Sequence, residues 1–298
     1  MNPKICQMIT DRIIESLDAG VCPWRKPWTG GATYAFNYTN LRPYSFLNQM
    51  ILSPGEYVTY KQAKDKGGQV KKGAKGKHVV FWKWLRYTSD GRLMKDDEPY
   101  GGEKKIPFLQ YYTVFNINDC EGLEPHNEEE LPKGAAADLD AEKVLIDYID
   151  REKIVLNRDQ LSGKACYNPY SDEITIPRFD QYESTAEYYS TAFHECVHST
   201  GTKSRLNRFD ESNPLGNLFG SDSYSKEELV AEMGSAFLVG ALGLETEGSF
   251  KNSAAYIGGW RNQIKKDNQL VVLAAGKAEK AFRYILNLNQ TPESTKEN

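Results

Sequence analysis

The pattern of apolar residues predicts two helices and two strands in the first part of the chain. Residues 4–17 place apolar side chains at the spacing of one helix face, and Gly20 would end that helix. Residues 43–52 form a short, largely apolar run that predicts a second, buried helix. The runs 79–84 and 109–115 are rich in valine and aromatic residues, which favours β-strands. This part is therefore predicted to mix helix and sheet.

The rest of the chain predicts short strands and several longer helices. Strands are expected at 154–156, 165–167 and 173–176, where short apolar segments are separated by Ser-Gly and Asn-Pro turns. Helical spacing of apolar residues predicts helices at about 140–150, 184–201, 225–242, 252–260 and 270–288. Taken together, these elements predict an α+β fold in which a small sheet precedes a group of helices.

The local charge of the chain changes sign near residue 120. From Lys61 to Arg86, nine lysines and arginines accompany a single acid, Asp65. Residues 121–130 are rich in glutamate and are followed by prolines and small residues, a composition typical of an exposed linker. We therefore predict an N-terminal α+β domain at 1–122, a linker at 123–137, a C-terminal domain at 138–290 and a flexible tail at 291–298.

Composition excludes several classes of protein. A length of 298 residues suits two domains, and 40% hydrophobic residues with a mean hydropathy of −0.61 indicate a globular chain. No apolar run approaches the roughly 18 residues that a membrane-spanning helix needs, and residues 1–20 lack a secretory signal. The five cysteines are scattered and form no CxxC pair, which argues against a disulfide framework and a zinc ribbon. We expect a cytoplasmic protein with no membrane partner.

The basic stretch of the N-terminal domain is interleaved with aromatic residues. Single-stranded nucleic acid is bound by this combination, because cations follow the phosphates while rings stack on bases. The candidate DNA-binding residues in this stretch are Lys61, Lys64, Lys71, Lys72, Lys75, Lys77, Trp82, Lys83 and Trp84, and the strand at 109–115 could extend the same surface. The alternative is that the lysines form only a solvated face.

A second aromatic and basic segment lies earlier in the chain, at residues 23–28. Its alternation of proline, tryptophan and cation allows two interpretations. Trp24 and Arg25 could stack on bases and contact phosphates, or the segment could be a rigid turn whose indoles pack against the first helix. Trp24 and Arg25 are therefore further candidates for DNA binding.

The strongest chemical signal is the sequence His194-Glu195-Cys196-Val197-His198. Positions i and i+4 lie on one face of a helix, so His194 and His198 can offer two imidazoles to one metal ion. A catalytic zinc site uses three protein ligands and a water, whose pKa the metal lowers. Glu195 is then the candidate general base, and zinc is the expected cofactor, with manganese as the alternative. A pair of histidines with a purely structural role is the competing interpretation.

The helix at 225–242 is the source of the third ligand. Glu228 and Glu232 are four residues apart and share a helix face. We predict Glu228 as the metal ligand and Glu232 as the carboxylate that orients a histidine, although the reverse assignment stays open. Tyr256 could stabilise the oxyanion that forms when water attacks a carbonyl. A small sheet followed by a helix with this histidine motif is the arrangement of zincin hydrolases. In these enzymes an edge strand can pair with an extended peptide, and residues 174–176 are the candidate strand.

The motifs together resemble those of the ArdC-type antirestriction proteins of conjugative plasmids and phages. The resemblance covers nearly the whole chain, although Asn40 stands where many relatives have glycine. It is carried by Ile14-Glu15 to Pro23-Trp24, Pro43-Tyr44-Ser45, Leu47-Asn48-Gln49-Met50, Tyr60 to Lys64, Gly68 to Gly73, His194 to Gly201, Ser204 to Arg208 and Glu227 to Glu232.

This resemblance implies a two-domain protein and a role in protecting incoming DNA from host restriction. The N-terminal domain would bind single-stranded DNA with little sequence preference, and the C-terminal domain would be a zincin-like metallopeptidase. Host restriction or defence proteins are then the candidate peptidase substrates. Two alternatives remain open: a DNA-coating protein whose metal domain is structural or inactive, and a peptidase that cleaves a regulator.

Overall fold

The computed structural model describes residues 2–25, 33–95, 98, 104–131, 133–136, 138–159, 161–209, 222–244 and 254–288. Its elements are α1 (Pro3–Asp18), β1 (Ala35–Asn37), α2 (Phe46–Ile51), β2 (Gly55–Thr59), α3 (Tyr60–Asp65), β3 (Gln69–Val70), β4 (Lys77–Tyr87), β5 (Lys104–Asn116), β6 (Cys120–Glu121), α4 (Ala141–Glu152), β7 (Val155–Asn157), β8 (Cys166–Asn168), β9 (Glu173–Thr175), α5 (Thr185–Ser199), α6 (Asp222–Ala241), α7 (Ala254–Lys266) and α8 (Leu270–Ile285). Short 3₁₀ helices occupy Ile117–Asp119, Glu128–Glu130 and Phe179–Gln181. The predicted helices and strands are present with ends shifted by a few residues, while β1, β2, α3, β3 and β6 were not predicted.

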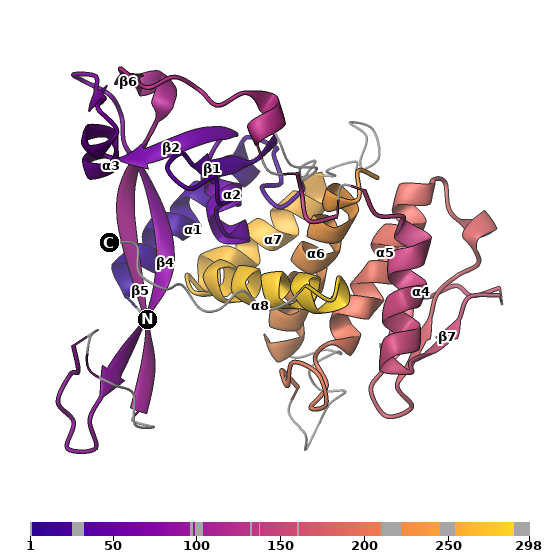
Figure 1. Cartoon of the computed structure of the whole chain (residues 1–298). Coiled ribbons are helices and arrows are strands. Elements are labelled where there is room, and N and C mark those ends of the chain that lie inside the picture. The colour runs from indigo at the N-terminus through magenta and orange to yellow at the C-terminus, as the bar shows by residue number, and fades with distance from the viewer. Residues whose placement is uncertain are drawn as a thin grey trace.

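The N-terminal part is built on a four-stranded sheet with the order β1-β2-β5-β4. β1 and β2 are parallel, and the remaining neighbours are antiparallel. β4 and β5 pair continuously from Lys77 opposite Val114 to Tyr87 opposite Lys104, so they form a long ribbon that extends well beyond the other two strands (Figure 1). One face of this ribbon packs against the core through Val80 and Leu109, because alternate side chains of a strand point to opposite faces.

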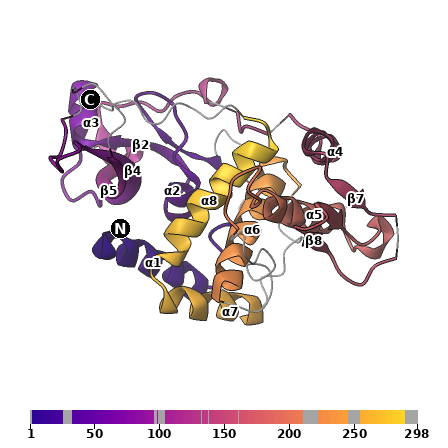
Figure 2. The same ribbon diagram turned by 90° about the horizontal axis from the view of Figure 1, so that it is seen from below.

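The C-terminal part consists of a small sheet and a group of helices. The sheet has the order β7-β9-β8, in which β9 is parallel to β7 and antiparallel to β8. α5 lies beside this sheet and packs closely against α6, while α8 packs against α6 in turn (Figures 1 and 2). No helix within the described residues is both long and apolar enough to span a membrane.

The largest hydrophobic core contains buried residues of both parts, and two smaller clusters lie within the N-terminal part. α1 packs on α7 and α8, and Thr10 donates a hydrogen bond of 2.9 Å to the carbonyl oxygen of Asn268 (Figure 2). Phe46 of α2 lies between Phe237 of α6 and Phe282 of α8, with ring centroids 3.9 and 4.8 Å apart. The main core therefore runs through both parts of the chain.

The predicted linker at 123–137 is attached to the N-terminal sheet at its start. The backbone N–H and Nδ1 of His126 lie 2.9 and 2.5 Å from the two carboxylate oxygens of Glu56, which is buried. The Tyr38 hydroxyl donates to the carbonyl oxygen of Glu124, and Ala136 near the far end is fully buried. Pro132 and Ala137 lie outside the described residues. The predicted linker is therefore bound to the N-terminal part at its start and buried near its end.

The shared core leads to a prediction about Phe46. Its replacement by alanine should destabilise the protein by about 3–5 kcal/mol, because a buried phenylalanine is removed and a cavity is left between α2, α6 and α8. Denaturant unfolding followed by tryptophan fluorescence and by circular dichroism should move to lower midpoints together. Tyr60→Ala, at a ring that is 64% exposed, is the control and should change stability by less than about 0.5 kcal/mol. Separate transitions in the wild type would contradict a common core.

Candidate metal centre

Two adjacent helices, α5 and α6, carry the candidate site. α5 begins at Ser184, whose side chain accepts a hydrogen bond from the backbone of Glu187, and it places both histidines in its last two turns. α6 is apolar around most of its circumference, as expected for a buried helix. Three acids, Glu227, Glu228 and Glu232, interrupt this apolar surface. Acids in a buried helix need partners, and these partners define the site.

A glycine in α6 allows the two helices to approach closely. A Cβ atom added at Gly234 would lie 2.8 Å from Cγ2 of Val197 on α5. Any larger side chain at this position would push the helices apart. Val197 precedes His198 in the sequence, so this close contact sets the distance between the helices that carry the candidate metal ligands.

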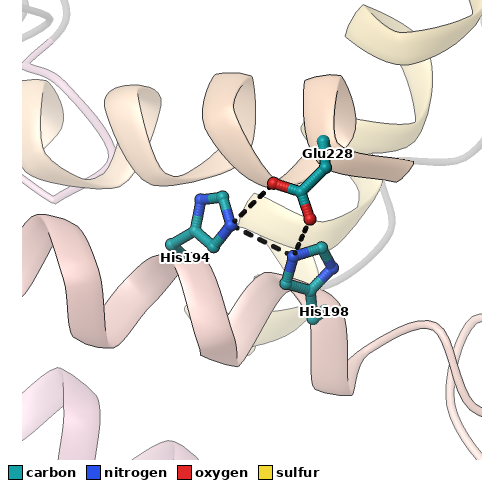
Figure 3. A group of neighbouring side chains, drawn as sticks. All are labelled: His194, His198 and Glu228. Atoms are coloured by element: carbon teal, nitrogen blue, oxygen red, sulfur yellow. Dashed lines mark hydrogen bonds and ion pairs between the residues drawn. The ribbon is translucent and has the colours of Figure 1, made fainter. Parts of the chain in front are cut away.

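His194, His198 and Glu228 converge on one point between the helices (Figure 3). The two Nε2 atoms are 3.1 Å apart. The carboxylate of Glu228 lies across them, with one oxygen 3.4 Å from Nε2 of His194 and the other 3.2 Å from Nε2 of His198. Within the described residues, these three form the one group of such side chains that is arranged to hold a metal ion.

The separation of the two imidazoles fits a tetrahedral zinc site. Zinc bonds of about 2.0–2.1 Å to nitrogen and oxygen place neighbouring ligand atoms about 3.3–3.4 Å apart. The two Nε2 atoms are 3.1 Å apart, close to this value, and each lies 3.4 or 3.2 Å from a different oxygen of the Glu228 carboxylate. Hydrogen bonds from the imidazoles lower the pKa of Glu228 to about 2 against the opposing effect of its burial, so the carboxylate is in the ionised form that binds metal.

Glu195 lies beside this group in a buried position. Burial raises the pKa of its carboxyl group, and the neighbouring imidazoles of His194 and His198 offset this only in part. The carboxylate also accepts a hydrogen bond from the backbone of Tyr167 in β8. Glu195 thus points from α5 toward β8, and its raised pKa suits a group that accepts and returns a proton.

A buried ion pair between Glu227 and Arg208 lies on the Nδ1 side of His198. Nδ1 of His198 lies 3.7 Å from Oε1 of Glu227, whose carboxylate is held by Nε and Nη2 of Arg208 at 3.1 and 2.5 Å. Arg208 also donates to the carbonyl oxygen of Val197 and to the hydroxyl of Thr200 at the end of α5. Burial tends to raise the pKa of Glu227, but Arg208 and His198 lower it more, so its carboxyl pKa stays below the ordinary value.

Glu227 therefore occupies the place that the sequence suggested for Glu232. Sequence reasoning missed Glu227 and Arg208, although two signals were present. Glu227 adjoins the predicted ligand in a helix that is otherwise apolar, and Arg208 belongs to the basic run that follows the histidine motif. The carboxylate of Glu232 points elsewhere, because it lies 3.5 Å from Nη2 of Arg25.

A second buried arginine fixes the sheet against α5. Arg205 donates to Glu152 at the end of α4, to both carboxylate oxygens of Asp172 between β8 and β9, and to the carbonyl oxygen of Ser199. Arg205 thereby holds β8, which is an edge strand of the sheet, beside Glu195. The expectation that residues 174–176 form the exposed edge is wrong, because β9 lies in the middle of the sheet.

The segment around Trp24 does not form an exposed stacking surface. Trp24 is fully buried in the main core, and Arg25 belongs to the contact with Glu232. This agrees with the interpretation of the segment as a rigid turn. Lys26 and Trp28 lie outside the described residues, as does the side chain of Tyr256, although the backbone of Tyr256 belongs to α7.

The predicted DNA-binding residues of the basic stretch fall on different parts of the N-terminal domain. The exposed lysines Lys61, Lys64, Lys71, Lys72 and Lys75 lie on α3 and on the connection from β3 to β4, and Lys77 is the exposed first residue of β4. Strand alternation places Trp82 and Trp84 on the face of the β4–β5 ribbon opposite to Lys83, and Trp82 packs against the core. The three residues therefore do not share one surface.

The outward face of the ribbon instead joins Lys83 to Phe81, Phe108 and Tyr112, of which only Tyr112 lies in the strand that the sequence suggested as an extension of the surface. Lys83 lies opposite Phe108, and the ring of Phe81 stacks on that of Tyr112 with centroids 4.5 Å apart and an angle of 4°. Tyr112 and Phe108 are 42% and 37% exposed. We call these residues, with Lys77, the outer ribbon face. Side chains alternate between the two faces of a strand, and this alternation in the sequence could have assigned each residue to one face of the ribbon.

Comparison with known proteins supports both halves of this description. Residues 3–115 match a family model described as the N-terminal domain of anti-restriction factor ArdC. Residues 147–277 match a model described as a zincin-like metallopeptidase. The chain is also 33% and 32% identical to two Escherichia coli proteins named DNA primase TraC over 97% and 95% of its own length. It spans only 20% and 27% of the length of these two proteins.

Solved structures cover the whole arrangement. The crystal structure of the antirestriction ArdC protein from plasmid R388 in its metal-free form is 34% identical, with a TM-score of 0.65, and the match covers 94% of this chain and 96% of that one. The chain belongs to the ArdC family. The Mn(II)-bound form of the R388 protein matches with a TM-score of 0.67 at 33% identity, over 96% and 99% of the two chains. An uncharacterized Sinorhizobium fredii protein, y4eC, is 30% identical over 92% of this chain and 89% of its own length.

These findings bear on the expectations from sequence. The resemblance to ArdC-type proteins is confirmed, and so is an α+β fold with an N-terminal ArdC domain and a zincin-like domain. The predicted cofactor, zinc with manganese as the alternative, agrees with the zincin-like description and with the Mn(II)-bound relative. The roles of individual site residues remain predictions.

The support of His198 by Glu227 can be measured through metal binding. Glu227→Gln removes the charge beside Nδ1, and loss of such a partner typically weakens metal affinity by about 10- to 100-fold. A competition titration of zinc against a chromophoric chelator measures this change. Glu187→Gln, at an exposed position in the first turn of the same helix as His198, is the matched control and should bind zinc as the wild type does. Wild-type zinc affinity in Glu227→Gln would show that Glu227 does not support the ligand.

Proposed function

We propose that this protein protects incoming DNA from restriction by two linked activities. Its N-terminal domain, residues 1–122, binds single-stranded DNA with little sequence preference, and its C-terminal domain, residues 138–290, is a zinc-dependent metallopeptidase. The observation that carries the proposal is the convergence of His194, His198 and Glu228 beside the buried carboxylate of Glu195. Host restriction or defence proteins are the proposed substrates.

The side chains of the site divide the chemical work. His194, His198 and Glu228 would hold the metal, which when bound lowers the pKa of water and polarises a carbonyl group. Glu195 would accept the proton of the attacking water at its carboxylate and pass that proton to the leaving amine. The burial that raises the pKa of Glu195 favours its protonated form between these two steps.

The edge strand β8 provides a place for the substrate backbone. β8 pairs with β9 along one side, which leaves its other side free of strand partners within the described residues. An extended peptide could add to that side through main-chain hydrogen bonds. The Tyr167 backbone in β8 contacts Glu195, so a peptide bound there would lie next to the general base.

DNA binding is supported by the charge and rings of the N-terminal domain. The outer ribbon face combines Lys77 and Lys83 with the rings of Phe81, Phe108 and Tyr112. The exposed lysines of α3 and of the β3–β4 connection add cations beyond one end of this face (Figure 1). Rings can stack on bases of any identity while cations follow the phosphates, so this surface suits binding that is not sequence-specific.

The role of Glu195 can be tested by Glu195→Gln. This change should abolish peptide hydrolysis, because the amide cannot accept the proton of water, while zinc content and DNA affinity stay at wild-type levels. A proteomic comparison of cells that express the wild type or the variant would identify cleaved host proteins. Antirestriction that persists in Glu195→Gln would favour DNA coating as the whole mechanism, and full hydrolysis would remove Glu195 from the reaction.

The DNA surface can be tested by separating rings from charges. Tyr112→Ala should weaken binding of a short single strand by about 1–3 kcal/mol, because one base can no longer stack on the ring. Replacing Lys71, Lys72, Lys75 and Lys77 by alanine should flatten the dependence of log K on log salt by about 0.7 for each phosphate that the protein no longer neutralises. Fluorescence anisotropy at several salt concentrations measures both effects. Lys143→Ala on α4 is the control, and an unchanged salt slope in the fourfold variant would refute the proposed surface.

A further inference from the structure

A second carboxylate lies on the face of α6 that carries the metal ligand. Glu228 meets the histidines of α5, and Ser235, seven residues later, hydrogen-bonds Ser190 of α5 at 2.6 Å. Residues seven apart lie almost directly above one another on a helix. Glu232 lies between them along the helix axis but about 40° to one side of Glu228, so its side chain starts at the edge of the surface of α6 that faces α5.

The spacing of the two acids allows both to reach one ion. Glu228 and Glu232 are four residues apart, as are His194 and His198, which converge on a single point. Cβ atoms at this spacing are about 5–6 Å apart, and a glutamate side chain has three rotatable bonds. Two imidazoles and two carboxylates would fill all four positions of a tetrahedral ion. Such closed coordination is typical of structural zinc sites, whereas a catalytic site keeps one position for water.

In the structure, Glu232 contacts a cation instead of the histidines. Nη2 of Arg25 lies 3.5 Å from Oε2 of Glu232, and the two side chains are only 15% and 25% exposed. Arg25 follows Trp24, which is fully buried, so the backbone that carries the guanidinium is firmly anchored. Partial burial strengthens the attraction between the two charges compared with an exposed pair. The cation comes from the N-terminal domain, and the carboxylate from the helix that binds the metal.

We propose that Arg25 is a positioning residue for the metal centre. By binding Glu232, it keeps the second carboxylate of α6 out of the coordination sphere and leaves one position open for water. The inference rests on the proposed metallopeptidase function and gives the N-terminal domain a part in it. It also accounts for two residues, Arg25 and Glu232, to which the sequence suggested other roles.

Water bound to the metal is the quantity that tests this inference. In the Mn(II)-loaded wild type, an ion with an open position should enhance the relaxation of bulk water protons through an exchanging inner-sphere water. Mn(II) commonly takes six ligands, so Arg25→Met, which keeps an unbranched side chain, should lose part of this enhancement because Glu232 displaces one of the inner-sphere waters. The double variant Arg25→Met with Glu232→Gln should regain it, since the competing carboxylate is gone. Arg25→Lys keeps the cation and should retain the enhancement.

Each result has a defined meaning. Wild-type enhancement in Arg25→Met, or an equal loss in the double variant, would overturn the role of Arg25. If Arg25→Met does not fold, Arg25→Gln removes the same charge with a polar side chain and is read in the same way. A wild type that binds Mn(II) without enhancement would refute this inference alone. A wild type that binds neither Mn(II) nor zinc would refute the proposed metallopeptidase.

Discussion

The packing of α5 against α6 is the constraint on which the metal centre depends. One helix supplies the imidazoles and the other supplies the carboxylates. The absence of a side chain at Gly234 lets the two helices approach closely enough for these groups to meet. This brings His198, Glu227 and Glu228 into a largely buried space, where each unpaired charge would cost several kcal/mol. Arg208 balances Glu227 and at the same time binds the end of α5. The same side chain therefore neutralises the site and holds its two helices together.

The two chemical surfaces of the molecule lie on different sides. Figures 1 and 2 show the β4–β5 ribbon at one end of the molecule and α4, α5 and the small sheet at the other, with α6 and α8 between them. A strand of DNA on the outer ribbon face would leave the edge of β8 accessible. The shared core nevertheless joins the two regions, because α1 and α2 pack directly on α7, α8 and α6. Binding at one surface need not block the other.

Sequence alone could predict what depends on local geometry. The spacing of His194 and His198 fixes their common face once a helix forms, and Glu228 follows from the next helix that carries acids. Partners across the fold were beyond this reasoning. Glu232 was expected beside a histidine and lies instead against Arg25. Trp24 was one candidate for a DNA surface, and tertiary packing places it in the core. The order of strands in the small sheet was equally inaccessible, because short apolar runs do not reveal their neighbours.

The ring of Phe46 between two helices of the other half has a consequence for how such proteins change over time. A substitution at Phe46 alters the volume available to Phe237 and Phe282, so these three positions cannot vary independently. Recombination that joined the first half of this chain to the second half of a distant relative would bring together surfaces that had drifted apart. Successful exchanges are therefore expected to move both halves as one block, with the crossover points outside it.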